Sequence, residues 1–238
     1  MEAIKDKVIL ITGGTKGIGL GVAQSLIKAG AKVAVTGRSE HTAVDALRTL
    51  ELIKGGDVMS IVADVRQAAD LQRAVTAILE KWGKLDVLVA NAGVGHFASI
   101  ESLTEEQWHE TIDTNLTGVF LSIKASLAEL KKTRGYIITM ASLAGTNFFA
   151  GASAYNASKF GLVGFTQAVM LDVRNSGVKV TTIMPGSVAS HFNDHTPSAE
   201  DAWKIQPEDI GQIVIDLLKM NPRTLPSKIE VRPTIPKG

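Results

Sequence analysis

Cysteine is absent from this chain of 238 residues, and aromatic residues make up only 5% of it. Without cysteine there is no disulfide and no thiolate metal site, which suits the reducing cytoplasm. A strong charge of either sign is also missing, because 25 basic residues are balanced by 24 acidic ones. A nearly neutral chain gives no sign of a nucleic-acid surface or of attraction to a membrane. We therefore expect a cytoplasmic protein whose partners are neither nucleic acids nor membranes.

Long hydrophobic runs are lacking as well. The first residues, Met-Glu-Ala-Ile-Lys-Asp-Lys, are charged, and the apolar run after them is too short for a signal sequence or a membrane span. No low-complexity stretch, repeat or linker divides the chain, so we expect a single domain over residues 1–238.

Short apolar runs alternate with helical patterns along the whole chain. The predicted strands lie at 7–12, 32–36, 57–62, 85–90, 135–140, 178–184 and 228–232. The predicted helices lie at 17–29, 41–53, 67–82, 104–132 (broken near Asn115), 153–175 and 207–219. Such alternation is typical of right-handed βαβ units. It predicts an α/β fold with a doubly wound, seven-stranded parallel sheet and helices on both faces.

The first strand runs into a glycine-rich turn. Val8-Ile-Leu-Ile-Thr is followed by Gly13, Gly17 and Gly19 and then by a helical stretch. Glycines let the backbone approach a pyrophosphate, and the N-terminus of the next helix offers free N–H groups and a positive dipole end. Strand, turn and helix in this order predict a dinucleotide site.

Tyr155 and Lys159 indicate the chemistry. Four residues apart on a helix, their side chains share one face. An ammonium group beside a phenol favours the phenolate, so we expect Lys159 to lower the pKa of Tyr155 and make it a general acid or base. Ser142 lies upstream after an apolar run and is a candidate to position a substrate oxygen and stabilise its developing charge.

These motifs, in this order, resemble the classical short-chain dehydrogenase/reductase family over nearly the whole chain. The resemblance implies a Rossmann fold and adds Asn115 to Ser142, Tyr155 and Lys159 as catalytic residues, with Asn115 fixing a water that links Lys159 to solvent. It also implies positions that contact a cofactor at the ends of the strands. These are Gly13, Thr15, Lys16, Gly17, Ile18, Gly19, Asp64, Val65, Asn91, Ala92, Gly93, Tyr155, Lys159, Pro185, Gly186 and Val188.

The end of the second strand bears on the choice of cofactor. In family members that bind NAD an acidic residue there holds the ribose 2′-hydroxyl, but this chain reads Thr-Gly-Arg38-Ser39. The fork of Arg38 can pair with a 2′-phosphate, Ser39 can donate a further hydrogen bond, and Lys16 adds positive charge. We therefore predict NADP(H) as the cofactor.

The resemblance is nearest to the ketoacyl reductase-like carbonyl reductases, but two features argue against a carrier-bound substrate. Leu171 precedes Asp172 where those reductases commonly have an arginine, and the C-terminal sequence differs from theirs. The sequence therefore favours a small ketone, aldehyde or secondary alcohol. Alternatives are a ketoacyl-carrier reductase, an isomerase or epimerase, and a non-catalytic NADP-binding redox sensor. Phe148 and Phe149 either line the substrate pocket or pack as core.

The segment 188–206 interrupts the alternation just past the sixth strand, where ligands of such sheets bind, and it is a candidate substrate lid. Its His191 and His195 lack an evident third ligand, so we expect no metal site. The family usually pairs its long helices across two-fold axes, which implies a homodimer or homotetramer. Small residues that would allow a close approach are Ala154, Ala157, Gly161 and Gly164.

Overall fold

The computed structural model describes residues 4–235 as a parallel sheet covered by helices. The order of its strands is β3-β2-β1-β4-β5-β6-β7, and every neighbouring pair is parallel. The strands are β1 (Val8–Thr12), β2 (Lys32–Gly37), β3 (Asp57–Val62), β4 (Val87–Ala90), β5 (Tyr136–Met140), β6 (Lys179–Pro185) and β7 (Lys228–Val231). The predicted seven-stranded, doubly wound sheet is confirmed.

Helices connect consecutive strands from β1 to β7. They are α1 (Gly17–Lys28), α2 (Glu40–Glu51), α3 (Ala68–Trp82), α4 (Glu105–Ile112), α5 (Gly118–Thr133), α6 (Ser153–Val173) and α7 (Pro207–Lys219). The ends of these helices and strands differ from the predicted ones by no more than two residues. The agreement is close because glycines and short polar stretches punctuate the chain.

The α-helical pattern is interrupted near Asn115, where the sequence predicted a break. Instead of ending the helix, the backbone passes from α4 into α5 through one π-helical turn, Asp113–Thr117. A capping box between Thr104 and Gln107 fixes the start of α4. A single π turn inside a long helix often lies at a functional site, and this one carries Asn115.

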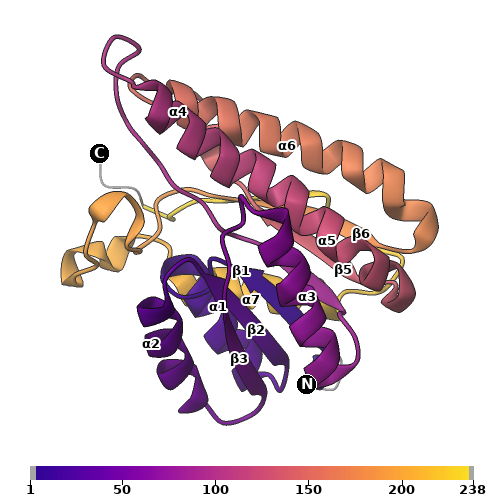
Figure 1. The fold of residues 1–238 in the computed structure, drawn as a ribbon. Coiled ribbons are helices and arrows are strands. Elements are labelled where there is room, and N and C mark those ends of the chain that lie inside the picture. Colours follow the sequence, from indigo (N-terminus) through magenta and orange to yellow (C-terminus); the bar gives the residue numbers. More distant parts are fainter. Residues whose placement is uncertain (1–3, 236–238) are drawn as a thin grey trace.

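Alternate residues of the strands face opposite layers of helices. In β1, Ile9 and Ile11 belong to a core that includes residues of α1, α2 and α7, whereas Val8 and Leu10 belong to one that includes residues of α3, α5 and α6. Figure 1 shows α4, α5 and α6 gathered on one side of the molecule and α1 and α2 on the other. The central strands are apolar on both faces because both faces are covered.

The direction of winding reverses at β1, which lies between β2 and β4. Ligands of open parallel sheets bind beyond the carboxyl ends of the strands at such a switch point. Thr12 is paired with Ala90, so the glycine turn after β1 and the Asn91 motif after β4 leave the sheet side by side. The fold therefore brings both predicted cofactor motifs to one edge.

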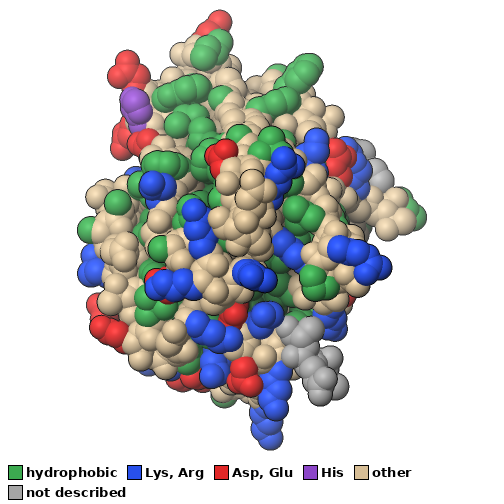
Figure 2. Space-filling view, turned by 90° about the vertical axis from the view of Figure 1, so that its right-hand side faces the viewer, with side chains coloured by type: hydrophobic (Ala, Val, Ile, Leu, Met, Phe, Trp, Pro, Cys, Tyr) green, Lys and Arg blue, Asp and Glu red, His purple; other side chains and the backbone are tan. Residues whose placement is uncertain are grey.

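Charges of both signs are spread over the surface. On the face in Figure 2, Lys and Arg side chains lie among hydrophobic and acidic ones. Some of these charges are paired, since Lys7 and Lys84 both lie within 4 Å of Asp86, at 3.8 and 2.8 Å. In residues 4–235, no helix is both long and apolar enough to cross a membrane.

Candidate active site

The turn between β1 and α1 has the geometry of a phosphate cradle. Gly13 and Gly17 have left-handed backbones, with φ of +63° and +56°, that an L side chain rarely adopts. Lys16 occupies the N-cap position of α1 without a side-chain hydrogen bond, and the first turn holds no acidic residue. The N–H groups at the start of α1 thus remain for an anion, as a dinucleotide pyrophosphate requires.

Asn91 fastens this turn to the end of β4. Its side-chain nitrogen donates hydrogen bonds of 3.0 Å to the carbonyl oxygens of Thr12 and Gly13. A Cβ on Gly19 would lie 2.5 Å from that nitrogen, and one on Gly13 would lie 2.7 Å from Cα of Ala92. Tight packing therefore shapes the cradle and explains why glycine stands at both positions, and the resulting turn fits the pyrophosphate of a dinucleotide.

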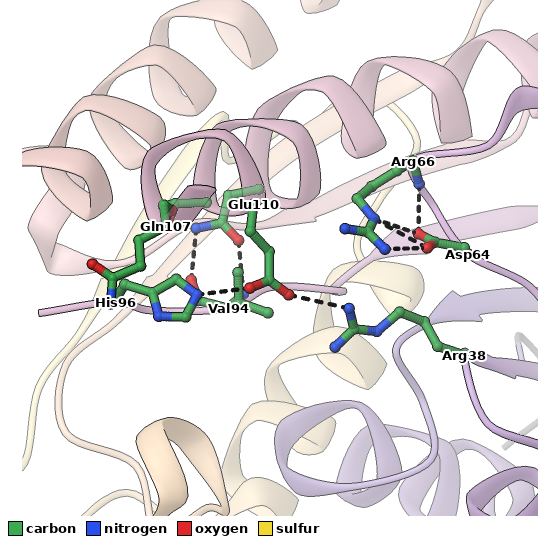
Figure 3. A network of polar contacts seen from close by, with 9 residues as sticks. Arg38, Asp64, Arg66, Val94, His96, Gln107 and Glu110 are labelled. Atoms are coloured by element: carbon green, nitrogen blue, oxygen red, sulfur yellow. Dashed lines mark hydrogen bonds and ion pairs between the residues drawn. The ribbon is translucent and has the colours of Figure 1, made fainter. Parts of the chain in front are cut away.

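Arg38 lies beyond the end of β2, as predicted, but its guanidinium already has a partner. Its Nη1 is 3.2 Å from Oε1 of Glu110 on α4, and Oε2 of Glu110 is 2.8 Å from Nε2 of His96. Figure 3 shows Glu110 between the two. Hydrogen bonds from His96 and Arg38 hold the pKa of Glu110 below its usual value despite partial burial. A cofactor phosphate at Arg38 would compete with this carboxylate for the guanidinium.

Glu110 and His96 were missed by the sequence interpretation. Glu110 is 72 residues from Arg38 along the chain and lies in the last turn of α4. The same short helix begins with Glu105 and Glu106, acidic residues that normally indicate only a favourable helix dipole. Ser39 is exposed at the N-cap of α2, and its side chain makes no capping hydrogen bond.

Asp64 follows β3 as expected for a residue near the adenine, but its carboxylate binds Arg66. The guanidinium of Arg66 approaches both oxygens, the shortest distance being 2.6 Å, and its backbone N–H donates to Oδ1. These bonds hold the pKa of Asp64 low (Figure 3). Val65 is buried, and a Cβ on Gly118 would lie 2.7 Å from its Cγ2. The contact of Asp64 and Val65 with the adenine remains a prediction.

Tyr155 and Lys159 lie one turn apart on α6, and both are buried. The Ser142 side chain acts on the Tyr155 hydroxyl and lowers its pKa, and the Ser142 oxygen accepts the backbone N–H of Ala144 at 3.1 Å. Nζ of Lys159 lies 5.6 Å from the centroid of the Tyr155 ring and donates a 3.0 Å hydrogen bond to the carbonyl oxygen of Met140. The structure thus brings the predicted serine, tyrosine and lysine together at the ends of β5 and α6.

The expected effect of Lys159 on Tyr155 is wrong in this structure. Burial raises the pKa of Tyr155 above its ordinary value of 10.0, and the hydrogen bond with Ser142 offsets only part of the increase. Burial also lowers the pKa of Lys159 from 10.5 to about 8. Desolvation is the largest cause of both shifts because the site is enclosed. At neutral pH Tyr155 is therefore a neutral phenol, able to donate a proton.

Asn115 holds the loop after β4 against α6. Its Oδ1 accepts the backbone N–H of Val94 at 2.8 Å, and its Nδ2 donates to the Val94 carbonyl at 2.9 Å and to Oγ of Ser158 at 3.0 Å. A Cβ on Gly93 would lie 3.2 Å from Oδ1 of Asn115 and 3.7 Å from Nζ of Lys159. The side chain of Asn115 is thus engaged by protein, so the water expected from the resemblance would need other atoms to hold it.

The segment 188–206 begins beside the cofactor turn and is closed at its base. Val188 and Ile205 form a parallel bridge, with Ala189 N–H donating to the Ile205 carbonyl at 2.9 Å. A Cβ on Gly17 would lie 3.3 Å from Cβ of Ser190. Just before the segment, Pro185 ends β6 and the N–H of Gly186 donates to the Val231 carbonyl at 2.8 Å.

A cluster of charges stabilises the interior of this segment. Oδ2 of Asp201 is 2.6 Å from Nε2 of His195 and accepts the N–H of Ser198 at 3.0 Å, while Oδ1 is 2.6 Å from Nζ of Lys204. Hydrogen bonds from Lys204 and His195 hold the pKa of Asp201 far below its usual range. Among the described residues, no group of three metal-ligating side chains comes together. His195 therefore has a structural partner.

Phenylalanine rings surround the Tyr155 side chain. The ring of Phe97, after β4, is 5.4 Å from that of Tyr155, and the ring of Phe192 is 5.6 Å from it on another side. Phe149 stacks on Phe97 at 6.0 Å, whereas the neighbouring Phe148 is 85% exposed. Of the two predicted pocket residues, only Phe149 joins the rings at the site.

Similarity to known proteins agrees with this geometry. Residues 7–201 match the family model of the short chain dehydrogenases. The chain is 36% identical over 196 residues to a 3-oxoacyl-[acyl-carrier-protein] reductase of Synechocystis sp., covering 82% of this chain and 79% of the relative. It is 35% identical over 234 residues to a sepiapterin reductase of Chlorobaculum tepidum, covering 95% and 96%.

Among solved structures, the chain is similar to the alcohol dehydrogenase of the archaeon Thermococcus sibiricus, which is complexed with 5-hydroxy-NADP. The TM-score is 0.91 and the sequence identity 28%, and the match covers 98% of this chain and 99% of that one. The phosphate cradle, the Ser142–Tyr155–Lys159 cluster and the match over most of the sequence lead to one assignment. This chain belongs to the short-chain dehydrogenase family.

Proposed function

We propose that the protein is an NADP(H)-dependent oxidoreductase that interconverts a small ketone or aldehyde with its alcohol. The observation that carries the proposal is the buried Tyr155 side chain, one helical turn from Lys159 and beside Ser142, at the same sheet edge as the phosphate cradle. Because burial keeps this phenol neutral, it can protonate an oxygen on which charge develops.

Each residue has a distinct task in this proposal. A bound nicotinamide would supply or accept the hydride. Ser142 would hold the substrate oxygen and stabilise its negative charge, and Tyr155 would transfer the proton. Lys159, with a pKa near 8, is mostly protonated at pH 7 and stabilises the phenolate that forms when Tyr155 loses its proton. Asn115 holds the loop after β4 in place against α6 through its hydrogen bonds to Val94 and Ser158.

Replacement of Tyr155 tests the proposal. Tyr155→Phe removes only the hydroxyl, so kcat should fall by about 10²- to 10⁴-fold while the protein stays folded. The other tyrosine in the chain, Tyr136, provides a matched control. Its hydroxyl forms a 2.7 Å hydrogen bond with Thr181 and is not part of the catalytic cluster. Tyr136→Phe should keep its turnover. A Tyr155→Phe enzyme with near-parental kcat would refute the role of the phenol.

Arg38 supports the choice of NADP over NAD. Directly after β2 stand Arg38 and Ser39 rather than a carboxylate that could bind a ribose 2′-hydroxyl, and the Thermococcus sibiricus alcohol dehydrogenase carries a derivative of NADP. Arg38→Ala should raise the KM for NADPH much more than the KM for NADH, since only NADPH has the 2′-phosphate. An equal effect on both cofactors would contradict this specificity.

A ketoacyl-carrier reductase is a second candidate, because the Synechocystis relative has that name. Against it, the position before Asp172 holds Leu171, a 53% exposed apolar residue, rather than an arginine for docking an acidic carrier. Comparing the rates with a free ketone and with a carrier-linked one separates the two proposals. A redox sensor or an isomerase would not consume NADPH in proportion to a carbonyl substrate.

We also propose a cytoplasmic homodimer or homotetramer that pairs α6 with its copy. Of the small residues expected on that helix, Ala157 and Gly164 are exposed, whereas Ala154 is buried and a Cβ on Gly161 would lie 3.1 Å from Leu116 of the same chain. Exposed apolar side chains on α6, such as Phe160, support the pairing. Sedimentation as a monomer at assay concentrations would contradict it.

A further inference from the structure

Exposed aromatic rings are concentrated at one place on a chain that has few of them. Three of its seven phenylalanines, Phe97, Phe149 and Phe192, come from three different loops and meet around Tyr155. Phe97 and Phe192 also contact each other edge to face, with centroids 6.2 Å apart. Their exposed fractions of 40%, 53% and 36% leave their apolar surfaces open toward solvent. An exposed apolar cluster beside a reactive hydroxyl is typical of a binding site.

Gly95 makes room for one of these rings. A Cβ at this position would lie 2.8 Å from Cε1 of Phe192 and 3.1 Å from Cε2 of Phe97. Gly95 does not have the left-handed backbone that would itself require glycine. The missing side chain therefore serves the packing of Phe192 over the site.

Three basic side chains close to the rings along the chain have acidic partners. His96, next to Phe97, is bound to Glu110 at 2.8 Å. In the segment that carries Phe192, His195 and Lys204 are both bound to Asp201 at 2.6 Å. The rings thus offer apolar and aromatic contacts, whereas these cations are engaged and do not supply a site for a substrate carboxylate or phosphate.

We infer that the preferred substrate is an uncharged aryl ketone, or in reverse the matching benzylic secondary alcohol, whose ring packs against the exposed surfaces of Phe97 and Phe192. This inference rests on the proposed function. In the reduction the carbonyl carbon takes a hydride from NADPH and the oxygen takes a proton from Tyr155, which gives the alcohol and NADP⁺. The aryl group lies against the phenylalanines while the oxygen meets Ser142.

The preference follows from ring–ring attraction. Aromatic pairs contribute about 0.5–1.5 kcal/mol beyond the burial of their surface, which corresponds to roughly 2- to 13-fold for each pair. We therefore expect kcat/KM to be roughly tenfold higher for methyl phenyl ketone than for methyl hexyl ketone, which has the same number of carbons. Both are methyl ketones, so the reacting carbonyl is similar in size.

Leucine variants test which rings matter. Phe97→Leu and Phe192→Leu keep an apolar side chain but remove the ring, and each should lower the aryl-to-alkyl ratio of kcat/KM by roughly threefold or more. Gly95→Ala should lower it as well, because the added methyl group displaces the Phe192 ring. Phe148→Leu is the matched control in the loop beside Phe149, and its ratio should equal that of the parent protein.

Binding without turnover gives a second readout. In saturation-transfer NMR with NADP⁺ present, the aromatic protons of methyl phenyl ketone should receive magnetisation from the parent protein and less from Phe192→Leu. A parent enzyme that reduces both ketones equally well, or leucine variants with unchanged ratios, would overturn the aryl preference and leave the proposed reductase intact. If the enzyme consumes no NADPH with either ketone, the proposed reductase function is refuted. If the NMR experiment then also shows no transfer to the aromatic protons, the aryl-binding site is refuted as well.

Discussion

Lys159 should make the folded protein less stable at neutral than at alkaline pH. Its ammonium group is buried beside the Tyr155 ring, with the Met140 carbonyl as its hydrogen-bond partner. Burial lowers the pKa of Lys159 to about 8, whereas the unfolded chain has the ordinary value of 10.5. Between these values the unfolded state binds more protons than the folded state. The free energy of unfolding therefore rises with pH across this window.

The size of this effect follows from the pKa difference. A gap of about 2.5 pH units at about 1.36 kcal/mol per unit means that the buried charge costs the folded state about 3 kcal/mol at pH 7. About 2 kcal/mol of this cost should disappear between about pH 7 and pH 9.5. Replacing Lys159 by Met removes the charge and also the hydrogen bond to Met140, whose loss costs about 1.5–3 kcal/mol. The variant is thus expected to match or slightly exceed the parent in stability at pH 7, although it is inactive.

Urea unfolding at several pH values measures this effect. The stability of Lys159→Met relative to the parent should decrease by about 2 kcal/mol between about pH 7 and pH 9.5, because only the parent gains from deprotonation. Lys124→Met, at an exposed position of α5, is the control and should keep a constant difference from the parent. A pH-independent difference for Lys159→Met would show that burial does not depress this pKa, and the account of the site would be wrong.

Two further predictions concern the cofactor region. Glu110→Gln removes the carboxylate that competes with NADPH for Arg38. Because this ion pair is partly exposed, NADPH should bind tighter by at most about fivefold in a fluorescence titration. Weaker binding would contradict the competition. Gly19→Ala should lower stability by about 1–3 kcal/mol and weaken cofactor binding, because its Cβ would lie 2.5 Å from Nδ2 of Asn91. Gly164→Ala is the control, because a Cβ at this position of α6 meets open space and should not lower the stability of the monomer. An equal loss of stability in the Gly19 and Gly164 variants would refute the packing argument.

Local features of the sequence determined the fold and the identity of the reactive groups. The run Val8–Thr12 could only be a strand covered on both faces, and glycines at 13 and 17 had to provide left-handed backbone before a helix. The spacing of Tyr155 and Lys159 placed both on one side of a helix. Such features depend on neighbours within a few residues, so the printed sequence contains them in full.

Tertiary structure alone decided how these groups are charged and what they contact. The sequence predicted an acidic Tyr155, but burial, which depends on the enclosing layers, raises its pKa. Glu110 on α4 meets Arg38 beyond the end of β2 because the fold brings these two segments together, although 72 residues separate them along the chain. In the same way two loops bring Phe97 and Phe192 to the ring of Tyr155. Desolvation and long-range contacts are properties of the packed chain, and no short stretch of sequence encodes them.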